Sequence, residues 1–141
     1  MSTNTKEVTE DYTLVSTIVI PALFKELATK EFAVVMALMP FISYNDGILR
    51  CNGQIATGKM ISDALEEKYE TFKKILSSLI KKEVVKKIQI PSETYRTKTR
   101  KCLVANPYIY RKRKNVASNI LENFQESRWA NITGNNENYN F

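Results

Sequence analysis

The sequence predicts one mainly helical α+β domain, and three observations lead to this prediction. Of the 141 residues, 43% are hydrophobic and 26% charged, which suits a single globular domain that needs no disulfides. Apolar residues recur at helical spacing, most clearly in residues 69–83. Two β-branched segments, residues 84–90 and 99–105, flank a polar loop and predict an antiparallel hairpin. We expect a flexible arm at residues 1–13, the domain at 14–130 and a flexible tail at 131–141.

The N-terminal third of the chain predicts helices followed by a short strand. Residues 14–21 are β-branched and apolar, which fits a strand or an extended lead-in, so both stay open. Residues 22–28 suggest a short helix. Thr29 is a suitable N-cap for a longer, largely apolar helix that Pro40 ends or kinks. A turn and then a short strand are expected within residues 43–51.

The middle of the chain predicts two helices joined by a tight turn. Thr57 can cap a helix that runs to about Leu65, and residues 66–68 form a polar break. A second helix is expected over residues 69–82, with polar side chains on its outer face. Its inner face consists of Phe72, Ile75, Leu76, Leu79 and Ile80. Beyond the hairpin, a last amphipathic helix is expected over residues 116–124.

Positive charge is concentrated in one part of the chain. The net charge is +6, but residues 68–114 carry +12 while residues 1–67 carry −4 and residues 115–141 carry −2. Such a segment suits a polyanion, of which a phosphate backbone is the commonest in a cytoplasm. A solvated lysine-rich face is the alternative explanation for the charge alone.

The element order then favours DNA binding. A helix, a tight turn, a second amphipathic helix and a basic hairpin follow one another as in a winged helix-turn-helix. That fold places the polar face of the second helix in a major groove about 12 Å wide, with the hairpin against phosphates or the minor groove. The expected recognition-helix contacts are Lys68, Tyr69, Glu70, Thr71, Lys73, Lys74 and Ser77. The expected wing contacts are Lys86, Lys87, Tyr95, Arg96, Lys98 and Arg100. Further candidate phosphate contacts are Arg111, Lys112, Arg113 and Lys114, for which a solvated turn is the alternative.

Residues 29–130 resemble winged helix-turn-helix proteins of Firmicute plasmids and phages, namely RepL-type replication proteins and related phage regulators. The helix-turn-helix pattern is matched by Leu65, Thr71, Phe72, Leu76, Leu79, Val84 and Val85. The C-terminal phrase of those proteins is matched by Asn106, Pro107, Tyr108, Ser127, Arg128 and Trp129. The resemblance implies sequence-specific duplex binding in replication or its control, while repressors and centromere-binding segregation adaptors share the scaffold. Two glycines of the pattern are replaced by Glu66 and Glu83, so both positions are expected to need altered backbone geometry.

The composition argues against an enzyme. The chain has no histidine, which excludes Ser-His and Cys-His pairs and imidazole-bound zinc. Cys51 and Cys102 form no CxxC motif and are expected to be buried thiols. No glycine-rich phosphate loop occurs, so we expect no cofactor and no metal.

The same features suggest the setting and the partners. The longest apolar run, residues 32–42, is far short of the roughly 20 residues that cross a bilayer, and the N-terminus does not resemble an export signal. We therefore expect a cytoplasmic protein without a membrane partner. A homodimer is expected because such readers commonly bind two half-sites, with residues 14–27 and 116–124 as the interface. The alternative from another class is a protein-interaction module that docks onto a replication or segregation protein.

Overall fold

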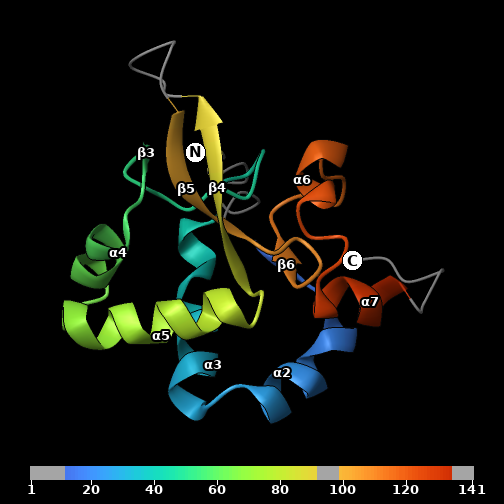
Figure 1. Cartoon of the computed structure of the whole chain (residues 1–141), viewed down its shortest axis with the longest axis horizontal. Helices are drawn as coiled ribbons and strands as arrows, with labels where there is room; N and C mark the ends of the chain where they lie inside the picture. Colours follow the sequence, from blue (N-terminus) through green and yellow to red (C-terminus); the bar gives the residue numbers. More distant parts are fainter. Residues whose placement is uncertain (1–11, 92–98, 135–141) are drawn as a thin grey trace, which may run out of the picture.

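A computed structural model describes residues 12–91 and 99–134 of the chain. It is a mixed helical and stranded structure with small antiparallel sheets (Figure 1). The helices are α2 (Ile20–Glu26), α3 (Thr29–Ala37), α4 (Gly58–Ala64), α5 (Tyr69–Lys81), α6 (Ser118–Glu122) and α7 (Arg128–Gly134), with short 3₁₀ turns η1 (Thr17–Val19) and η2 (Met39–Phe41). The strands are β1 (Leu14–Val15), β2 (Arg50–Cys51), β3 (Gln54–Ile55), β4 (Val85–Pro91), β5 (Thr99–Ala105) and β6 (Tyr110–Arg111).

The β4–β5 hairpin is the largest sheet and has a third chain segment beside it. Its register runs from Val85 opposite Ala105 to Pro91 opposite Thr99. Residues 47–49 lie along the other edge of β5: the Leu49 amide donates to the Leu103 carbonyl at 2.8 Å, and the Ala105 amide donates to the Gly47 carbonyl at 3.0 Å. The expected short strand is therefore present. Its end, β2, turns back into β3.

Residues with positive φ sit at three of the turns that the sequence marks. Asn52 and Gly53 have φ of 52° and 80° and join β2 to β3. Glu66 (φ 56°) ends α4, and Glu83 (φ 65°) joins α5 to β4. Both glutamates thus adopt the left-handed conformation that favours glycine, which is the altered backbone geometry expected at these positions. Thr57 caps α4 as expected, since its hydroxyl accepts from the Met60 amide at 3.2 Å.

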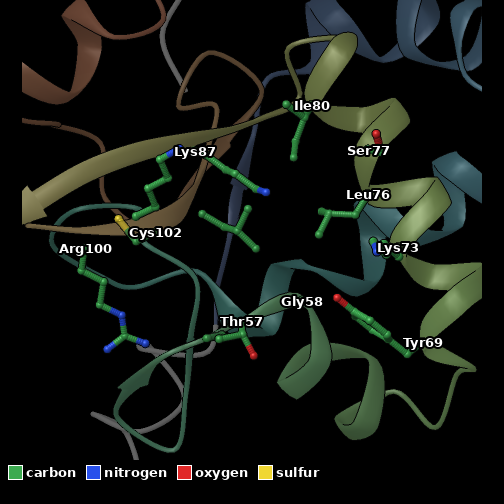
Figure 2. Close-up of a pocket in the computed structure, with 13 residues that line it drawn as sticks. Thr57, Gly58, Tyr69, Lys73, Leu76, Ser77, Ile80, Lys87, Arg100 and Cys102 are labelled. Carbon is green, nitrogen blue, oxygen red and sulfur yellow. The ribbon is translucent and has the colours of Figure 1, made fainter.

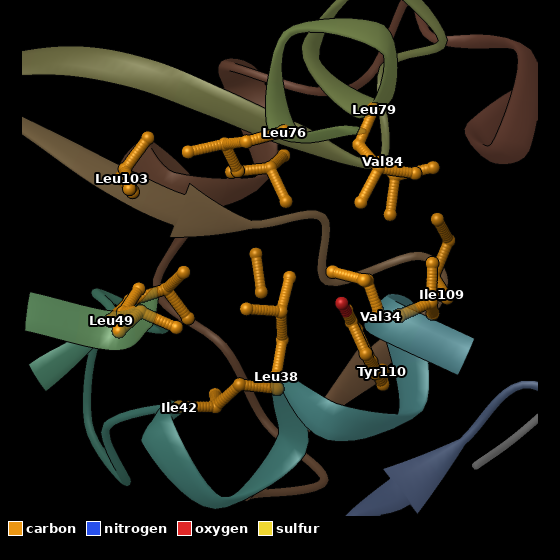
Figure 3. Close-up of a cluster of buried hydrophobic side chains, with 14 of the residues drawn as sticks. Val34, Leu38, Ile42, Leu49, Leu76, Leu79, Val84, Leu103, Ile109 and Tyr110 are labelled. Atoms are coloured by element: carbon orange, nitrogen blue, oxygen red, sulfur yellow. The ribbon is translucent and has the colours of Figure 1, made fainter. Parts of the chain in front are cut away.

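The hydrophobic core lies between α3, α5 and one face of the hairpin. Leu76 and Leu79 of α5 face Leu38, the residue that follows α3, and Leu103 of β5 (Figure 3). A second, smaller cluster lies on the opposite face of the hairpin and consists of Ile48, Ile55, Cys102, Val104 and Phe124. Figure 1 accordingly shows α4 and α5 on one side of the hairpin and α6 and α7 on the other. Both faces of the hairpin are thus partly covered, and the uncovered parts face solvent.

The N-terminal elements differ in part from the expectation. Only Leu14 and Val15 of residues 14–21 form a strand, which pairs with β6. The chain then turns through η1 into α2, which begins at Ile20 because Pro21 fits the first turn of a helix. The expected helix over residues 22–28 is confirmed with its start moved toward the N-terminus. Residues 1–11 of the expected arm lie outside the described residues, and Tyr12 and Thr13 are in no helix or strand.

The C-terminal elements correct two predictions. The expected helix over residues 116–124 is the short α6, after which α7 extends to Gly134, so residues 131–134 are helical and are not a flexible tail. The cause is Trp129: its ring is 1% exposed, and its Nε1 donates to the Lys82 carbonyl at 2.8 Å. That anchoring orders the helix around it. Residues 135–141 lie outside the described part of the chain.

Part of the expected dimer interface is buried within the chain itself. Val19, Leu23 and Leu27 are buried in the core of the same chain, as is Phe124. Those side chains cannot also face a second copy, so the interface as proposed from the sequence is wrong in these residues. In the described ranges, no helix combines the length and apolar character that crossing a bilayer requires.

Candidate nucleic-acid interface

α5 separates its apolar and polar side chains cleanly. Phe72, Leu76 and Leu79 are buried, whereas the other face of the helix is open to solvent. The exposed residues there include Lys68, Glu70, Thr71, Lys73, Lys74 and Ser77, and Tyr69 is half-buried. All seven residues expected to contact DNA from this helix therefore lie at or near the surface.

A cavity of about 380 Å³ separates α5 from the hairpin, and several of these side chains line it (Figure 2). Tyr69, Lys73 and Ser77 enter it from α5. Across from them are the hairpin cations Lys87, Arg100 and Lys101. The structure thus brings the expected recognition helix and part of the expected wing to the same cavity.

The start of α4 closes the cavity and fixes its shape. A Cβ atom on Gly58 would lie 3.2 Å from Cδ2 of Leu76, so α4 and α5 approach closely at this residue. Nearby, the ammonium groups of Lys59 and Lys73 lie 5.8 and 5.9 Å from the centre of the Tyr69 ring. The ring therefore holds two cations at the N-terminal end of α5 through cation–π attraction.

Adjacent lysines of β4 point to opposite faces of the hairpin. Lys87 lies on the face that borders the α5 cavity. Lys86 lies on the other face: its ammonium donates to the Asn123 carbonyl at 2.8 Å and sits 5.9 Å from the centre of the Phe124 ring. Strand alternation is the cause, because successive side chains leave a strand on opposite sides. Lys86 is consequently not part of the surface that α5 presents.

The sequence reasoning missed Lys101, which lies opposite Gln89 and lines the same cavity as Lys87. The alternation that separates Lys86 from Lys87 could have identified it. Arg100 also reaches the cavity, and one of its guanidinium nitrogens donates to the Ile55 carbonyl at 3.3 Å. The remaining expected wing contacts, Tyr95, Arg96 and Lys98, lie outside the described residues.

The basic segment 111–114 lies apart from this hollow, so the structure does not unite the two groups of expected contacts. Arg111 ties the segment together, donating to the carbonyls of Pro107 and Lys114 at 2.9 Å each. Arg113 donates to Asn45 Oδ1 at 3.1 Å, and Lys112 borders a different cavity, which shares no lining residue with that of α5. Lys114 is exposed.

A buried polar cluster behind α5 was also missed. Glu31 of α3 is 8% exposed, accepts from the Ser78 hydroxyl, and pairs with the Lys82 ammonium at 2.7 Å. Hydrogen bonding to Lys82 and then to Ser78 lowers the pKa of Glu31 to about 2. Glu31 also accepts from the Ala28 amide at 2.8 Å, so one carboxylate caps α3 and holds the end of α5. The sequence signal for the capping role, an acid in the first turn, was visible, but its partners on α5 were not.

Metal-ligating and thiol side chains were also considered as candidate sites in the sequence, and the described residues place them as follows. None of their His, Cys, Asp and Glu side chains gather in a group of three that could hold a metal ion. Both cysteines are free thiols; Cys102 is buried and Cys51 half-buried, so the expectation of burial holds fully for Cys102 only. Burial raises the pKa of Cys102, which disfavours the nucleophilic thiolate.

No family model, curated protein or solved structure matches this chain. The surface around α5 combines a helix with an exposed polar face that carries lysines and a hairpin with cations on the adjoining face.

Proposed function

We propose that this protein binds double-stranded DNA through a winged helix, with α5 in the major groove and the β4–β5 hairpin as the wing. One observation carries the proposal: the polar face of α5, with Lys73 and Ser77, continues across a shared hollow onto Lys87 and Lys101 of the hairpin. A continuous cationic surface built from a helix and a ribbon suits a duplex groove and its phosphate edge.

The order and pairing of the elements support this proposal. α3 is followed by the extended segment 47–49, by α4 and α5, and then by the paired strands β4 and β5. Segment 47–49 and β4 flank β5 on its two edges. A winged helix has this succession of helices and this three-stranded arrangement, in which the second helix of the tight pair enters the groove.

The side chains suit two kinds of contact. Lys73 and Lys74, in the N-terminal half of α5, can reach guanine O6 and N7, and Glu70 can accept from cytosine N4. Lys87 and Lys101 would contact phosphates, so they would contribute affinity more than sequence preference.

For the biological role, the resemblance of residues 29–130 to RepL-type replication proteins favours plasmid or phage replication or its control. A repressor or a centromere-binding adaptor would use the same surface. We further propose that two copies bind two half-sites about 34 Å apart, with contacts other than the buried Val19, Leu23 and Leu27.

The test is selection of bound duplexes from random DNA, followed by fluorescence anisotropy on the selected site. We expect one preferred sequence, palindromic if two copies bind. Lys73→Ala and Lys74→Ala should each remove about 1–3 kcal/mol of discrimination between that site and unrelated DNA. Lys25→Ala, at an exposed lysine of α2, is the matched control. It should change neither the affinity for the selected site nor its discrimination from unrelated DNA.

Two results would contradict the proposal. Absence of duplex binding even at low salt would leave only the protein-interaction module. Equal losses for Lys25→Ala and Lys73→Ala would mean that net charge, and not the α5 surface, attracts the DNA.

A further inference from the structure

A second cavity, of about 910 Å³, lies away from α5 between residues 12–13, η2 and the turn that follows it. Tyr12, Tyr44, Asn45 and Lys112 are among its lining residues. Its size falls within the about 300–1,000 Å³ of small-ligand sites. It shares no lining residue with the α5 cavity.

Two tyrosines in this cavity are unusually exposed for large rings. Tyr12 is 64% and Tyr44 53% exposed, and they are two of four large apolar side chains among the described residues that are left open in this way. Exposed rings that share one cavity suit a ligand with a flat apolar face.

Cationic side chains lie against Tyr44 and along the cavity. The Arg113 guanidinium lies 5.2 Å from the centre of the Tyr44 ring and donates to Asn45 Oδ1 at 3.1 Å, which fixes the basic segment against the turn. Lys112 lines the cavity, and Lys114 is exposed nearby in sequence. The occupant should therefore be anionic as well as aromatic.

The turn that carries Tyr44 is held in place before any ligand arrives. The Ser43 hydroxyl donates to the Ile48 carbonyl at 2.6 Å, and the Ile48 amide donates to Asp46 Oδ1 at 3.1 Å. Gly47, with φ of 72°, completes the turn. A ring on a fixed turn loses little conformational freedom when a base stacks on it, which favours binding.

We propose that this cavity binds unpaired bases of a single-stranded nucleic acid, stacked on Tyr44 and Tyr12, with the neighbouring phosphates held by Lys112 and Lys114. Stacked pairs in a duplex expose only their edges, whereas an unpaired base offers the face that an exposed tyrosine can cover. Asn45 can hydrogen-bond a base edge, and the Arg113 plane extends the stack. This inference goes beyond the proposed duplex binding and uses none of its residues.

The test is anisotropy of a labelled oligothymidine of about 12 nucleotides, a length within the site sizes of single-strand binders. Tyr44→Ala should weaken binding about tenfold or more, because base–aromatic stacking is worth about 1–3 kcal/mol per base. Tyr44→Phe keeps the ring and should bind within about twofold of the wild type. Phe24→Ala removes an even more exposed ring outside the cavity and should have no effect. Equal or tighter binding of the matching oligouridine also supports the proposal and assigns the ligand as RNA.

The same variants separate this inference from duplex binding. Tyr44→Ala should leave the affinity for the selected duplex unchanged, and Lys73→Ala should weaken the duplex without weakening the single strand. Unchanged oligothymidine binding by Tyr44→Ala and Tyr12→Ala would overturn the second site. Equal weakening of both ligands by Lys73→Ala would also overturn it, since one surface would then serve both, whereas a wild-type chain that binds the single strand but no duplex would count only against the α5 proposal.

Discussion

At the scale of single residues, Glu31 shows how one buried acid joins several elements. It caps α3 through the Ala28 amide and holds the last turn of α5 through Ser78 and Lys82. The Lys82 carbonyl in turn accepts from Trp129 Nε1, so α7 is attached at the same place. A carboxylate with this many donors is stabilised in its charged form, which is why its pKa is low.

We predict that Glu31 makes stability depend on pH below neutrality. Its pKa is lowered from 4.5 to about 2 in the folded chain, so its contribution is complete above about pH 5 and is lost as the pH falls toward 2. A shift of this size corresponds to about 3 kcal/mol, as an upper figure. Glu31→Gln should therefore lower the free energy of unfolding at pH 7 by up to about 3 kcal/mol and flatten its pH dependence.

Urea unfolding, monitored by the fluorescence of Trp129, measures the free energy of unfolding of both chains at several pH values. Glu26, whose pKa Arg128 also lowers, is more exposed, so solvent screens its contribution in the same window. Glu122→Gln on the exposed side of α6 is the control and should follow the wild type. A Glu31→Gln profile parallel to that of the wild type would show that the pair has no net effect.

At the scale of elements, the sequence predicted what local periodicity encodes. The 3.6-residue spacing of Phe72, Leu76 and Leu79 predicted α5 to within one residue, and the β-branched segment 99–105 matches β5. It failed where a distant contact decides the local structure. Residues 14–21 bend into a helix after two paired residues, and α7 is ordered by the burial of Trp129. Neither contact has a signal within its own segment.

For the candidate site, the sequence predicted residue types better than the directions in which they point. The polar face of α5 could be identified because helical spacing fixes which residues share a face. All basic hairpin residues were predicted to contact DNA as one wing. In the structure, however, Lys86 of β4 points to the Phe124 side and Lys87 to the α5 side. The strand expected over residues 84–90 instead pairs from Val85 to Pro91, with Pro91 opposite Thr99. A proline is tolerated there because it lies at the end of the strand.

Glu66 and Glu83, whose backbones are in the left-handed conformation, lead to a prediction about the turns that connect the elements. A side chain in this conformation costs roughly 1–2 kcal/mol, which glycine avoids at the expense of a more flexible unfolded chain. Glu83→Gly, at the joint of α5 and β4, should therefore raise the free energy of unfolding by about 0.5–1 kcal/mol. Glu66→Gly should act in the same direction after α4.

The same substitution inside a helix is the control. Glu70→Gly replaces an exposed glutamate of α5 and should lower the free energy of unfolding by about 1 kcal/mol. Denaturant unfolding of the three variants compares the signs directly. Destabilisation of similar size in all of them would mean that the joints are not strained by their side chains.

At the scale of the whole molecule, the charge distribution explains how one small chain can offer two separate surfaces. Among residues 68–91 and 99–114, which the structure describes, the cations do not form one patch: Lys73, Lys87 and Lys101 gather at the α5 cavity. Arg113 lies instead against Tyr44. Others serve the fold, as Lys82 does with Glu31. Only the first group continues from a helix onto a hairpin, so it should account for most of the dependence of duplex binding on salt.

That dependence can be stated and measured. If about six phosphates are neutralised, duplex affinity should fall about 10³-fold between 50 and 200 mM salt, because bound cations release counterions. Lys87→Ala should reduce the slope of log affinity against log salt by about one unit, as expected for one lost phosphate contact. Lys86→Ala, its neighbour on the opposite face, should leave the slope unchanged, because Asn123 and Phe124 already hold that ammonium. Salt-independent binding, or equal effects of the two lysines, would show that the duplex does not lie across α5 and this face of the hairpin.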